Sequence, residues 1–382
     1  MKTVIAIDSF KGSLSTFESG AAVAEGIRAV YPDAEVVISP IADGGEGTVS
    51  AIVSATGGEL CRAEVTGPLG DGIVAEYGIL PESKTAIIEM SAAAGITLVP
   101  QEKRNPLYTT TRGVGELMLD AMERGCRHFI MGIGGSATND GGVGMLSALG
   151  FEFLDENGEN VADGAVGLQA IRKIVLDKVD SRLAECDFRV ACDVKNPLCG
   201  ALGCSSVYGP QKGADERMIA DMDEWLSFYA ELTKSVIYDA DKDFPGVGAA
   251  GGLGFALKYY LGATLTSGIE LVMEATCLEE HIKDADLVIT GEGRLDGQTA
   301  MGKAPVGVAK LAKKHGKRVI AFAGAVTEDA GECNKQGIDA FFPIVRRPCS
   351  LDEAMDVGNA YKNLKNTAEQ VFRLMKSMTD ES

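Results

Sequence analysis

Four aspartates lie in short loops between small or polar residues: Asp43, Asp140, Asp193 and Asp296. A carboxylate in such a loop can be positioned by backbone donors and can then bind Mg²⁺ or accept the proton of a hydroxyl group. Stabilisation of a turn is the equally simple structural explanation for each of them. Asp193 is the strongest candidate for chemistry, because it follows an apolar run and precedes the chain reversal at residues 194–197.

A glycine-rich segment, GIGGSATNDGGVG at residues 132–144, follows another apolar run. Gly134 and Gly135 would let backbone N–H groups converge on a phosphate, and Ser136 and Thr138 would add hydroxyl donors. A tight turn with close helix packing is the alternative. The regular G-x-G-x-x-G spacing is absent, so a dinucleotide-binding fingerprint is not supported.

Lysines offer point charges for an anion. Lys11 follows the first apolar run, and Lys212 lies in a loop between glycines; each could neutralise a phosphate or carboxylate, although a solvated lysine is the simpler interpretation. Residues 297–303 (GQTAMGK) begin like a phosphate-binding loop, but Ala304 stands where a metal-binding Ser or Thr is required. We treat that match as coincidental, while Lys303, beside a helix start, could still neutralise a phosphate.

Covalent catalysis is not favoured. No Gly-x-Ser-x-Gly nucleophile elbow occurs, the three histidines are far apart in sequence, and the nine cysteines lack zinc-binding spacing, as expected of reduced thiols. The chemistry should therefore depend on positioning and electrostatics. Phosphoryl transfer fits this expectation, because it requires phosphate cradles, Mg²⁺ and one carboxylate near the acceptor hydroxyl.

The elements that would position these residues are mostly short buried strands. Apolar runs predict six parallel strands, near residues 3, 36, 129, 286, 318 and 340. If they wind both ways from the first strand, the switch point lies between the first strand and the strand near residue 286. Ligands bind outside the carboxyl ends of strands at such a point, which is where residues 8–11 and 291–296 would lie.

Two helix starts are marked by capping residues. Ser15 and Glu18 fit a capping box at the start of the first helix. Ser350 could cap one long amphipathic helix that ends the chain.

The region between the chain ends has a different character. From Cys61 to Ile96, period-2 stretches between Gly/Pro turns predict antiparallel strands. We therefore expect an α/β fold with two domains, in which a discontinuous Rossmann-like parallel-sheet domain is formed by both chain ends and a mixed α/β domain is inserted. The predicted ranges are residues 1–60, 106–135 and 282–382 for the first domain, and 61–105 and 136–281 for the second.

Charge and hydropathy exclude several kinds of partner. The 382 residues include 36 Lys and Arg and 55 Asp and Glu, for a net charge of −19, and such an acidic surface repels nucleic acids and anionic lipids. No apolar run approaches the roughly 20 residues of a membrane span, and the N-terminus becomes charged too soon for a signal peptide, so we expect a cytoplasmic protein. A small anionic ligand would need a local cluster of positive charge.

In their order along the chain, the Gly- and Asp-rich segments resemble those of the bacterial type I glycerate kinases. The resemblance covers essentially the whole length, and one small departure is Ile7, where family members have Pro before the first Asp. The segments that carry it are DSFKGS (8–13), ADGGEGT (42–48), VTGPLG (65–70), IEMSAAAG (88–95), TTTRGVGEL (109–117), IGGSATNDGG (133–142), ACDVKNPL (191–198), GPQKGA (209–214), GAAGGLG (248–254), SGIE (267–270) and ITGEGRLD (289–296).

The resemblance implies ATP-dependent phosphorylation of D-glycerate to 2-phosphoglycerate with Mg²⁺, in a cleft between two α/β domains; the choice of hydroxyl rests wholly on it. In that reaction we expect Asp193 to orient the acceptor hydroxyl as the leading catalytic residue, with Lys11 and Asp296. The substrate-binding candidates are Asp8, Ser9, Lys11, Asp43 and Arg294. The candidate Mg²⁺ ligands are Glu292 and Asp296. The nucleotide-binding candidates are Gly134, Gly135, Ser136, Thr138, Lys212, Gly251 and Gly252. A homodimer is left open.

Two alternatives remain at this point. A nicotinamide-dependent oxidoreductase acting on a hydroxy acid would also have a parallel sheet and many glycines, but the missing fingerprint and the lack of a suitable His argue against it. A small-anion-binding module without turnover would bind nucleotide or glycerate, and the intact Asp and Lys loops argue against that.

Overall fold

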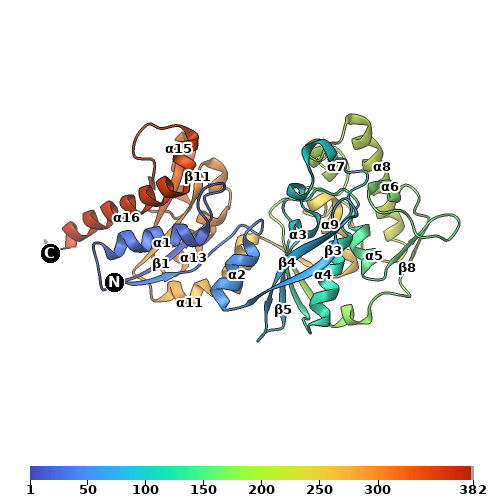
Figure 1. Ribbon diagram of the computed structural model, residues 1–382, viewed down its shortest axis with the longest axis horizontal. Helices are drawn as coiled ribbons and strands as arrows, with labels where there is room; N and C mark the ends of the chain where they lie inside the picture. Colours follow the sequence, from blue (N-terminus) through green and yellow to red (C-terminus); the bar gives the residue numbers. More distant parts are fainter. Residues whose placement is uncertain (380–382) are drawn as a thin grey trace. The chain divides into compact units, whose positions relative to one another are not determined.

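The structure, a computed structural model, describes residues 1–379 and divides into two compact units (Figure 1). Unit 1 is formed by residues 1–43, 54–56 and the described residues from 272 onwards, and unit 2 by residues 44–53 and 57–271. Unit 1 contains a parallel sheet and unit 2 a mixed sheet. The predicted α/β fold class is confirmed. That the reaction takes place in a cleft between two domains stays a prediction.

Unit 1 has a five-stranded sheet in the order β13-β12-β11-β1-β2, in which every pair of neighbours is parallel. Its strands are β1 (Lys2–Ile7), β2 (Glu35–Ile38), β11 (Leu287–Leu295), β12 (Arg318–Val326) and β13 (Ala340–Pro343). Its helices are α1 (Thr16–Arg28), α11 (Leu278–Lys283), α12 (Gly297–Ala300), α13 (Ala304–Lys314), α14 (Glu332–Lys335), α15 (Leu351–Met355) and α16 (Val357–Thr379). Two further helices, α2 (Thr48–Thr56) and α10 (Gly268–Ala275), each extend across a boundary between the units.

Strand β1 is buried on both faces, as the apolar run at the start of the chain predicts. Ile5 and Ile7 belong to a core with side chains of α1 and α16, while Val4 and Ala6, also buried, face the other side by strand alternation. Helix α13 packs against β1, β11 and β12. Figure 1 shows α1 and α16 side by side in unit 1. The central strands therefore lie within a packed core.

The structure confirms that the switch point of the sheet lies between β1 and β11. Strands β1 and β11 are neighbours, with Ile7 paired to Gly291. The chain crosses from β1 to β2 on one side of this pair and continues from β11 to β12 and β13 on the other. The loop after β1 and the end of β11 therefore lie next to each other, where a ligand site is expected.

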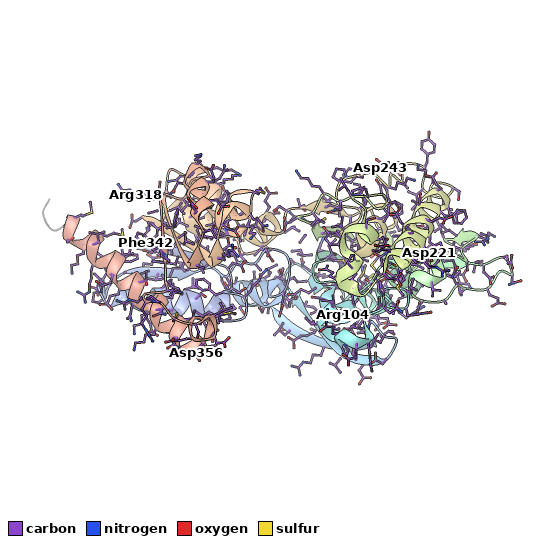
Figure 2. All side chains as sticks on the ribbon, turned by 90° about the horizontal axis from the view of Figure 1, so that it is seen from above. Arg104, Asp221, Asp243, Arg318, Phe342 and Asp356 are labelled. Carbon is purple, nitrogen blue, oxygen red and sulfur yellow. The ribbon has the colours of Figure 1, made fainter. Side chains whose placement is uncertain are left out.

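Helix boundaries were predicted well at the N-terminus and less well at the C-terminus. Ser15 and Glu18 form the capping box at the start of α1. Ser350 caps α15, but the single long helix that we predicted is wrong. Asp356, which Figure 2 labels, has an extended ψ of 127° and separates α15 from α16.

Unit 2 is built around a six-stranded mixed sheet in the order β10-β9-β6-β5-β4-β3, with β7 and β8 forming a separate pair. Its strands are β3 (Glu59–Thr66), β4 (Gly72–Leu80), β5 (Thr85–Glu89), β6 (His128–Gly132), β7 (Glu152–Leu154), β8 (Lys173–Val175), β9 (Asp187–Ala191) and β10 (Thr264–Thr266). Its helices are α3 (Ser91–Ala94), α4 (Arg112–Glu123), α5 (Val143–Ala148), α6 (Ala165–Leu168), α7 (Cys204–Tyr208), α8 (Glu216–Thr233) and α9 (Leu253–Tyr260).

The strand near residue 129 is a correction to the sequence analysis. Strands β3, β4 and β5 form the antiparallel part that we predicted, but β6 pairs in parallel with β5 and β9 and so belongs to unit 2. The assignment of residues 106–135 to the parallel-sheet domain is therefore wrong. The apolar pattern of β6 suits a buried strand in either sheet, and its partners come from distant parts of the chain.

Within residues 1–379, no helix has both the length and the hydropathy that are needed to cross a membrane.

Candidate active site

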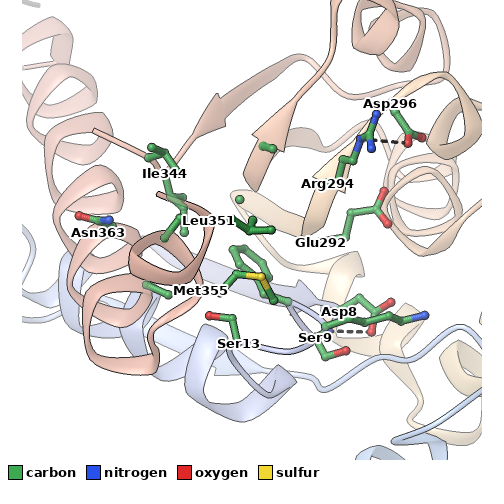
Figure 3. A pocket seen from close by; sticks show the side chains of 18 of the residues that line it. Asp8, Ser9, Ser13, Glu292, Arg294, Asp296, Ile344, Leu351, Met355 and Asn363 are labelled. Atoms are coloured by element: carbon green, nitrogen blue, oxygen red, sulfur yellow. Dashed lines mark hydrogen bonds and ion pairs between the residues drawn. The ribbon is translucent and has the colours of Figure 1, made fainter. Parts of the chain in front are cut away.

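A cavity of about 610 Å³ lies in unit 1 at the carboxyl ends of β1 and β11 (Figure 3). Both segments predicted to meet at the switch point line it: Asp8, Ser9 and Lys11 from the first, and Glu292, Arg294 and Asp296 from the second. Asp43 also lines the cavity, so the structure brings together all seven residues proposed for substrate and metal in this part of the chain.

Charges of both signs meet at one end of this cavity. The carboxylates are Asp8, Asp43, Glu292 and Asp296, and the cations are Lys11, Arg294 and Lys303. The ammonium of Lys11 lies 3.0 Å from a carboxylate oxygen of Asp43. A carboxylate of Asp296 lies 3.6 Å from Arg294 Nε and 3.8 Å from Lys303 Nζ. This mixed charge can receive an anion and a divalent cation together, which a net charge of −19 alone would not suggest.

Asp8 is the most perturbed of these carboxylates. Its side chain is buried and accepts a hydrogen bond from the backbone N–H of Ser9 at 2.7 Å. Burial, together with repulsion from Asp43, raises the pKa of Asp8 to about 7. Asp8 can therefore be protonated or ionised near neutral pH, depending on what binds beside it.

At Lys11, nearby charges outweigh burial in setting the pKa. Burial acts to lower its pKa, but the carboxylates around it, Asp43 first, raise it more, so the pKa of Lys11 lies above its ordinary value. The side chain is still 70 % exposed. Lys11 therefore remains a cation that is accessible to a ligand.

Glu292 and Asp296 are positioned by the short helix α12. The Asp296 side chain accepts the backbone N–H groups of Gln298 and Thr299 at 3.0 and 3.1 Å, and the Thr299 hydroxyl donates to Glu292. Burial raises the pKa of Glu292 above its ordinary value. Their carboxylate oxygens have the chemistry that Mg²⁺ prefers.

The donor set fits a nucleotide-bound Mg²⁺ better than a closed metal site. No group of three or more His, Cys, Asp or Glu arranged for a metal ion occurs within the described part of the chain. Mg²⁺ that is bound with a nucleotide takes only one or two protein carboxylates, and phosphates and water supply the rest. Glu292 and Asp296 meet that smaller requirement.

The other end of the cavity is apolar, and the sequence analysis missed it. Ile344, Leu351 and Met355 line this end, together with the polar side chains of Ser13 and Asn363 (Figure 3), and Phe10 also lines the cavity. Leu351 and Met355 belong to α15, which we had merged into one long helix. The one available signal was the cap at Ser350, which marks where α15 begins.

The nucleotide-binding candidates form a second cluster, in unit 2. Lys212 is 2 % exposed, and its ammonium donates to the Ser136 hydroxyl at 2.8 Å and to the Thr138 carbonyl oxygen at 2.7 Å. Burial lowers the pKa of Lys212 to about 8. A Cβ on Gly251 would lie 2.0 Å from the Thr138 carbonyl oxygen, so only glycine allows this packing. The structure therefore brings Ser136, Thr138, Lys212 and Gly251 together. Their side chains and backbone are buried, so a ligand cannot reach most of them directly.

The remaining glycines of this set differ in exposure. Gly134 and Gly135 are exposed, while Gly252 is buried at the start of α9. The part of the loop that a ligand can reach is therefore the Gly134–Gly135 turn. Asp140, by contrast, is fully buried and accepts hydrogen bonds from Thr111 and from two backbone N–H groups, and burial raises its pKa. Asp140 is a structural carboxylate, as the turn-stabilising alternative predicts.

Asp193 follows the carboxyl end of β9 and is exposed. It accepts the backbone N–H of Gly268, the first residue of α10, at 3.1 Å. Gly44 approaches the same strand end closely, since a Cβ there would lie 2.5 Å from the Ala191 Cβ. The carboxylate is thus held by a helix start while it remains accessible.

Comparisons with known proteins agree on one family. The model of the glycerate kinase family matches residues 3–376. Glycerate 2-kinase of Escherichia coli (strain K12) is 52 % identical over 371 residues, 97 % of each chain, and glycerate kinase of Bacillus cereus is 48 % identical over 381 residues, 100 % of each chain. A crystal structure described as glycerate kinase 2 from Salmonella typhimurium LT2 has a TM-score of 0.91 and 47 % identity, and it covers 100 % of this chain and 99 % of its own.

Proposed function

The chain belongs to the glycerate kinase family, and from this premise we infer that it is a glycerate 2-kinase. It is a phosphotransferase that moves the terminal phosphoryl group of ATP to the 2-hydroxyl of D-glycerate. The observation that carries this function is the charged end of the unit 1 cavity, where carboxylates and cations meet at the carboxyl ends of β1 and β11. Phosphoryl transfer depends on such positioned charges more than on covalent chemistry.

Binding of glycerate is assigned to the first loop and the end of β11. Arg294 and Lys11 bind the carboxylate, for which the planar guanidinium fork of Arg294 is suited. Asp43 is paired with Lys11 before the substrate arrives, and so keeps that ammonium in place. Asp8 and Ser9 contact the hydroxyl groups. Because the pKa of Asp8 is about 7, it can act as a donor or an acceptor there.

Glu292 and Asp296 would hold Mg²⁺ at this end of the cavity. When bound, Mg²⁺ neutralises negative charge on the phosphates. The hydrogen bonds from Thr299 and from the start of α12 keep the two carboxylates oriented toward that role.

We assign to Asp193 the role of accepting the proton of the 2-hydroxyl, and we assign Lys11 and Asp296 as the further catalytic residues. The Gly134–Gly135 turn provides backbone donors for a phosphate of the nucleotide. Ser136 and Thr138 support this turn from within the loop, and Gly251 and Gly252, which precede α9, pack against the loop. Lys212 acts as a positioning residue through its two hydrogen bonds.

The test is phosphorus NMR of the product formed from D-glycerate and Mg·ATP by the purified protein. A 2-phosphoglycerate resonance that grows with ADP is expected. L-Glycerate in place of D-glycerate provides the matched control. A 3-phosphoglycerate resonance would overturn the choice of hydroxyl, and ATP that stays intact with D-glycerate would overturn the kinase assignment.

A further inference from the structure

The unit 1 cavity has more room, and a more apolar lining, than D-glycerate can use. Its volume of about 610 Å³ lies within the range of roughly 300–1,000 Å³ that accommodates drug-sized ligands. A three-carbon hydroxy acid would fill a small part of it at the charged end. At the apolar end, Leu351, which is 72 % exposed, would then remain in contact with water.

We propose that this apolar end binds the adenine base of the nucleotide co-substrate. This inference rests on the proposed kinase function, because that function supplies the nucleotide. Adenine is flat and largely apolar, with hydrogen-bonding groups at its edge, so it is suited to a slot with apolar walls and a few polar side chains. The triphosphate would extend to the charged end, toward Lys303 at the start of α13.

The apolar walls come from different parts of unit 1. Phe10 follows β1 and is 3 % exposed, and Ile344 follows β13 and is 2 % exposed, so both are fixed by the core. Leu351 and Met355 are four residues apart and share one face of α15. Leu351 is 72 % exposed. A flat ring placed against Leu351 would cover apolar surface that is otherwise in contact with water.

Polar groups are available at the same end for the edge of the base. The hydroxyl oxygen of Ser13 is buried and has no hydrogen-bond partner among the described residues. Asn363 of α16 also lines the cavity, and its amide can both donate and accept (Figure 3).

The two ends of the cavity differ in chemistry, as the two ends of a nucleotide do. Figure 3 shows Leu351 and Met355 on one side of the cavity, and Arg294 and Asp296 on the other. A ligand that is apolar at one end and polyanionic at the other can satisfy both sides at once. D-Glycerate has no apolar end.

The experiment compares Leu351→Glu with Leu374→Glu in the full chain. Leu374 lies on α16, is 60 % exposed and does not line the cavity, so its variant is the matched control. We expect Leu351→Glu to raise the KM for ATP by about 10-fold or more, as for loss of one leucine contact, with the KM for D-glycerate within about 2-fold of wild type. Calorimetry with adenosine, which has no phosphates, should show binding to wild type and to Leu374→Glu but not to Leu351→Glu.

The outcomes separate this inference from the proposed function. An unchanged KM for ATP in folded Leu351→Glu would overturn the inference while the kinase activity stands. A rise in the KM for D-glycerate alone would also overturn it, because the apolar end would then serve the acceptor. If wild type forms no phosphoglycerate, yet adenosine binding is present and is lost in Leu351→Glu, then the kinase function fails and the base-binding site stands.

Discussion

The ammonium nitrogen of Lys212 lies 2.8 Å from the hydroxyl oxygen of Ser136, a residue 76 positions earlier in the chain. The same ammonium donates to the carbonyl oxygen of Thr138 at 2.7 Å, and the lysine is 2 % exposed. In this position Lys212 holds the loop that precedes α5. In the proposed function, Lys212 would therefore act on a nucleotide through the loop rather than through direct contact.

Replacing Lys212 tests this relationship. Lys212→Met removes both donors and leaves buried acceptors without partners, so we expect the free energy of unfolding to fall by roughly 2–4 kcal/mol. The KM for ATP should rise with it. Urea denaturation and steady-state kinetics measure the two effects, with the exposed Lys195→Met as control. A rise in the KM for ATP with no loss of stability would indicate direct phosphate contact instead.

The pH dependence of stability should report on Asp8. Its pKa is about 7 in the folded protein, because of burial and Asp43, and about 3.9 in an unfolded chain. Between these values the folded state binds the proton more tightly, so stability falls as pH rises from about 4 to 7 and stays lower above 7. Asp8→Asn removes the loss of stability that ionisation of this buried carboxyl causes. We expect the metal-free variant to be more stable than wild type at pH 8, by up to about 4 kcal/mol, with a gain that shrinks toward pH 4.

Urea denaturation in a chelating buffer at pH 5, 7 and 8 measures this difference. The exposed Asp33→Asn serves as the control and should show no such trend. An equal gain for Asp8→Asn at all three pH values would contradict the assignment of the effect to ionisation. Activity of the same variant should fall, because Asp8 lines the charged end of the cavity.

Local sequence signals predicted the polar half of the site. The capping box at Ser15, the apolar run of β1 and the polar residues after it are all short-range patterns, and the adjacency of β1 and β11 follows from general rules of parallel sheets. The polar segments after these two strands therefore predicted the charged end of the cavity.

The rest depends on long-range pairing and packing. The strand at Phe129 has the same apolar pattern as those of unit 1, and only its partners β5 and β9 decide which sheet it joins. The burial of Lys212 is not visible in a loop of glycines and polar residues. The apolar end of the cavity combines Phe10 with residues more than 330 positions later, so no local pattern could reveal it.

Asp193 should control the chemical step. Asp193→Asn keeps an oxygen that can accept the Gly268 N–H, so the loop should stay in place, while the ability to take the hydroxyl proton is lost. We expect kcat to fall by about 10²-fold or more, with both KM values changed by less than about 3-fold. The exposed Asp177→Asn is the control. Near-normal kcat in a folded Asp193→Asn protein would remove Asp193 from the mechanism.

Glu292 should set the requirement for Mg²⁺. Glu292→Gln can still accept from the Thr299 hydroxyl, but it loses the negative charge that favours the ion. We expect the Mg²⁺ concentration for half-maximal activity to rise by about 10-fold, and activity to disappear in all forms when a chelator removes the metal. A Mg²⁺ titration of the initial rate at saturating substrates measures this. The exposed Glu328→Gln should titrate as wild type does, and an equal curve for Glu292→Gln would exclude Glu292 as a ligand.

Two glycines of unit 1 should respond in opposite ways to the same substitution. A Cβ on Gly26 of α1 would lie 2.5 Å from the carbonyl oxygen of Lys365 and 2.9 Å from the Cβ of Ala368, both on α16. Gly26→Ala therefore forces the two helices apart, and we expect a loss of roughly 1–3 kcal/mol despite the better helix propensity of alanine. Gly331, with a φ of −55° and open space around its Cβ position, should gain about 0.4–1 kcal/mol as alanine, because the unfolded chain loses freedom. Urea denaturation followed by circular dichroism compares the two variants, and a stabilising Gly26→Ala would show that the contact between α1 and α16 is looser than these distances require.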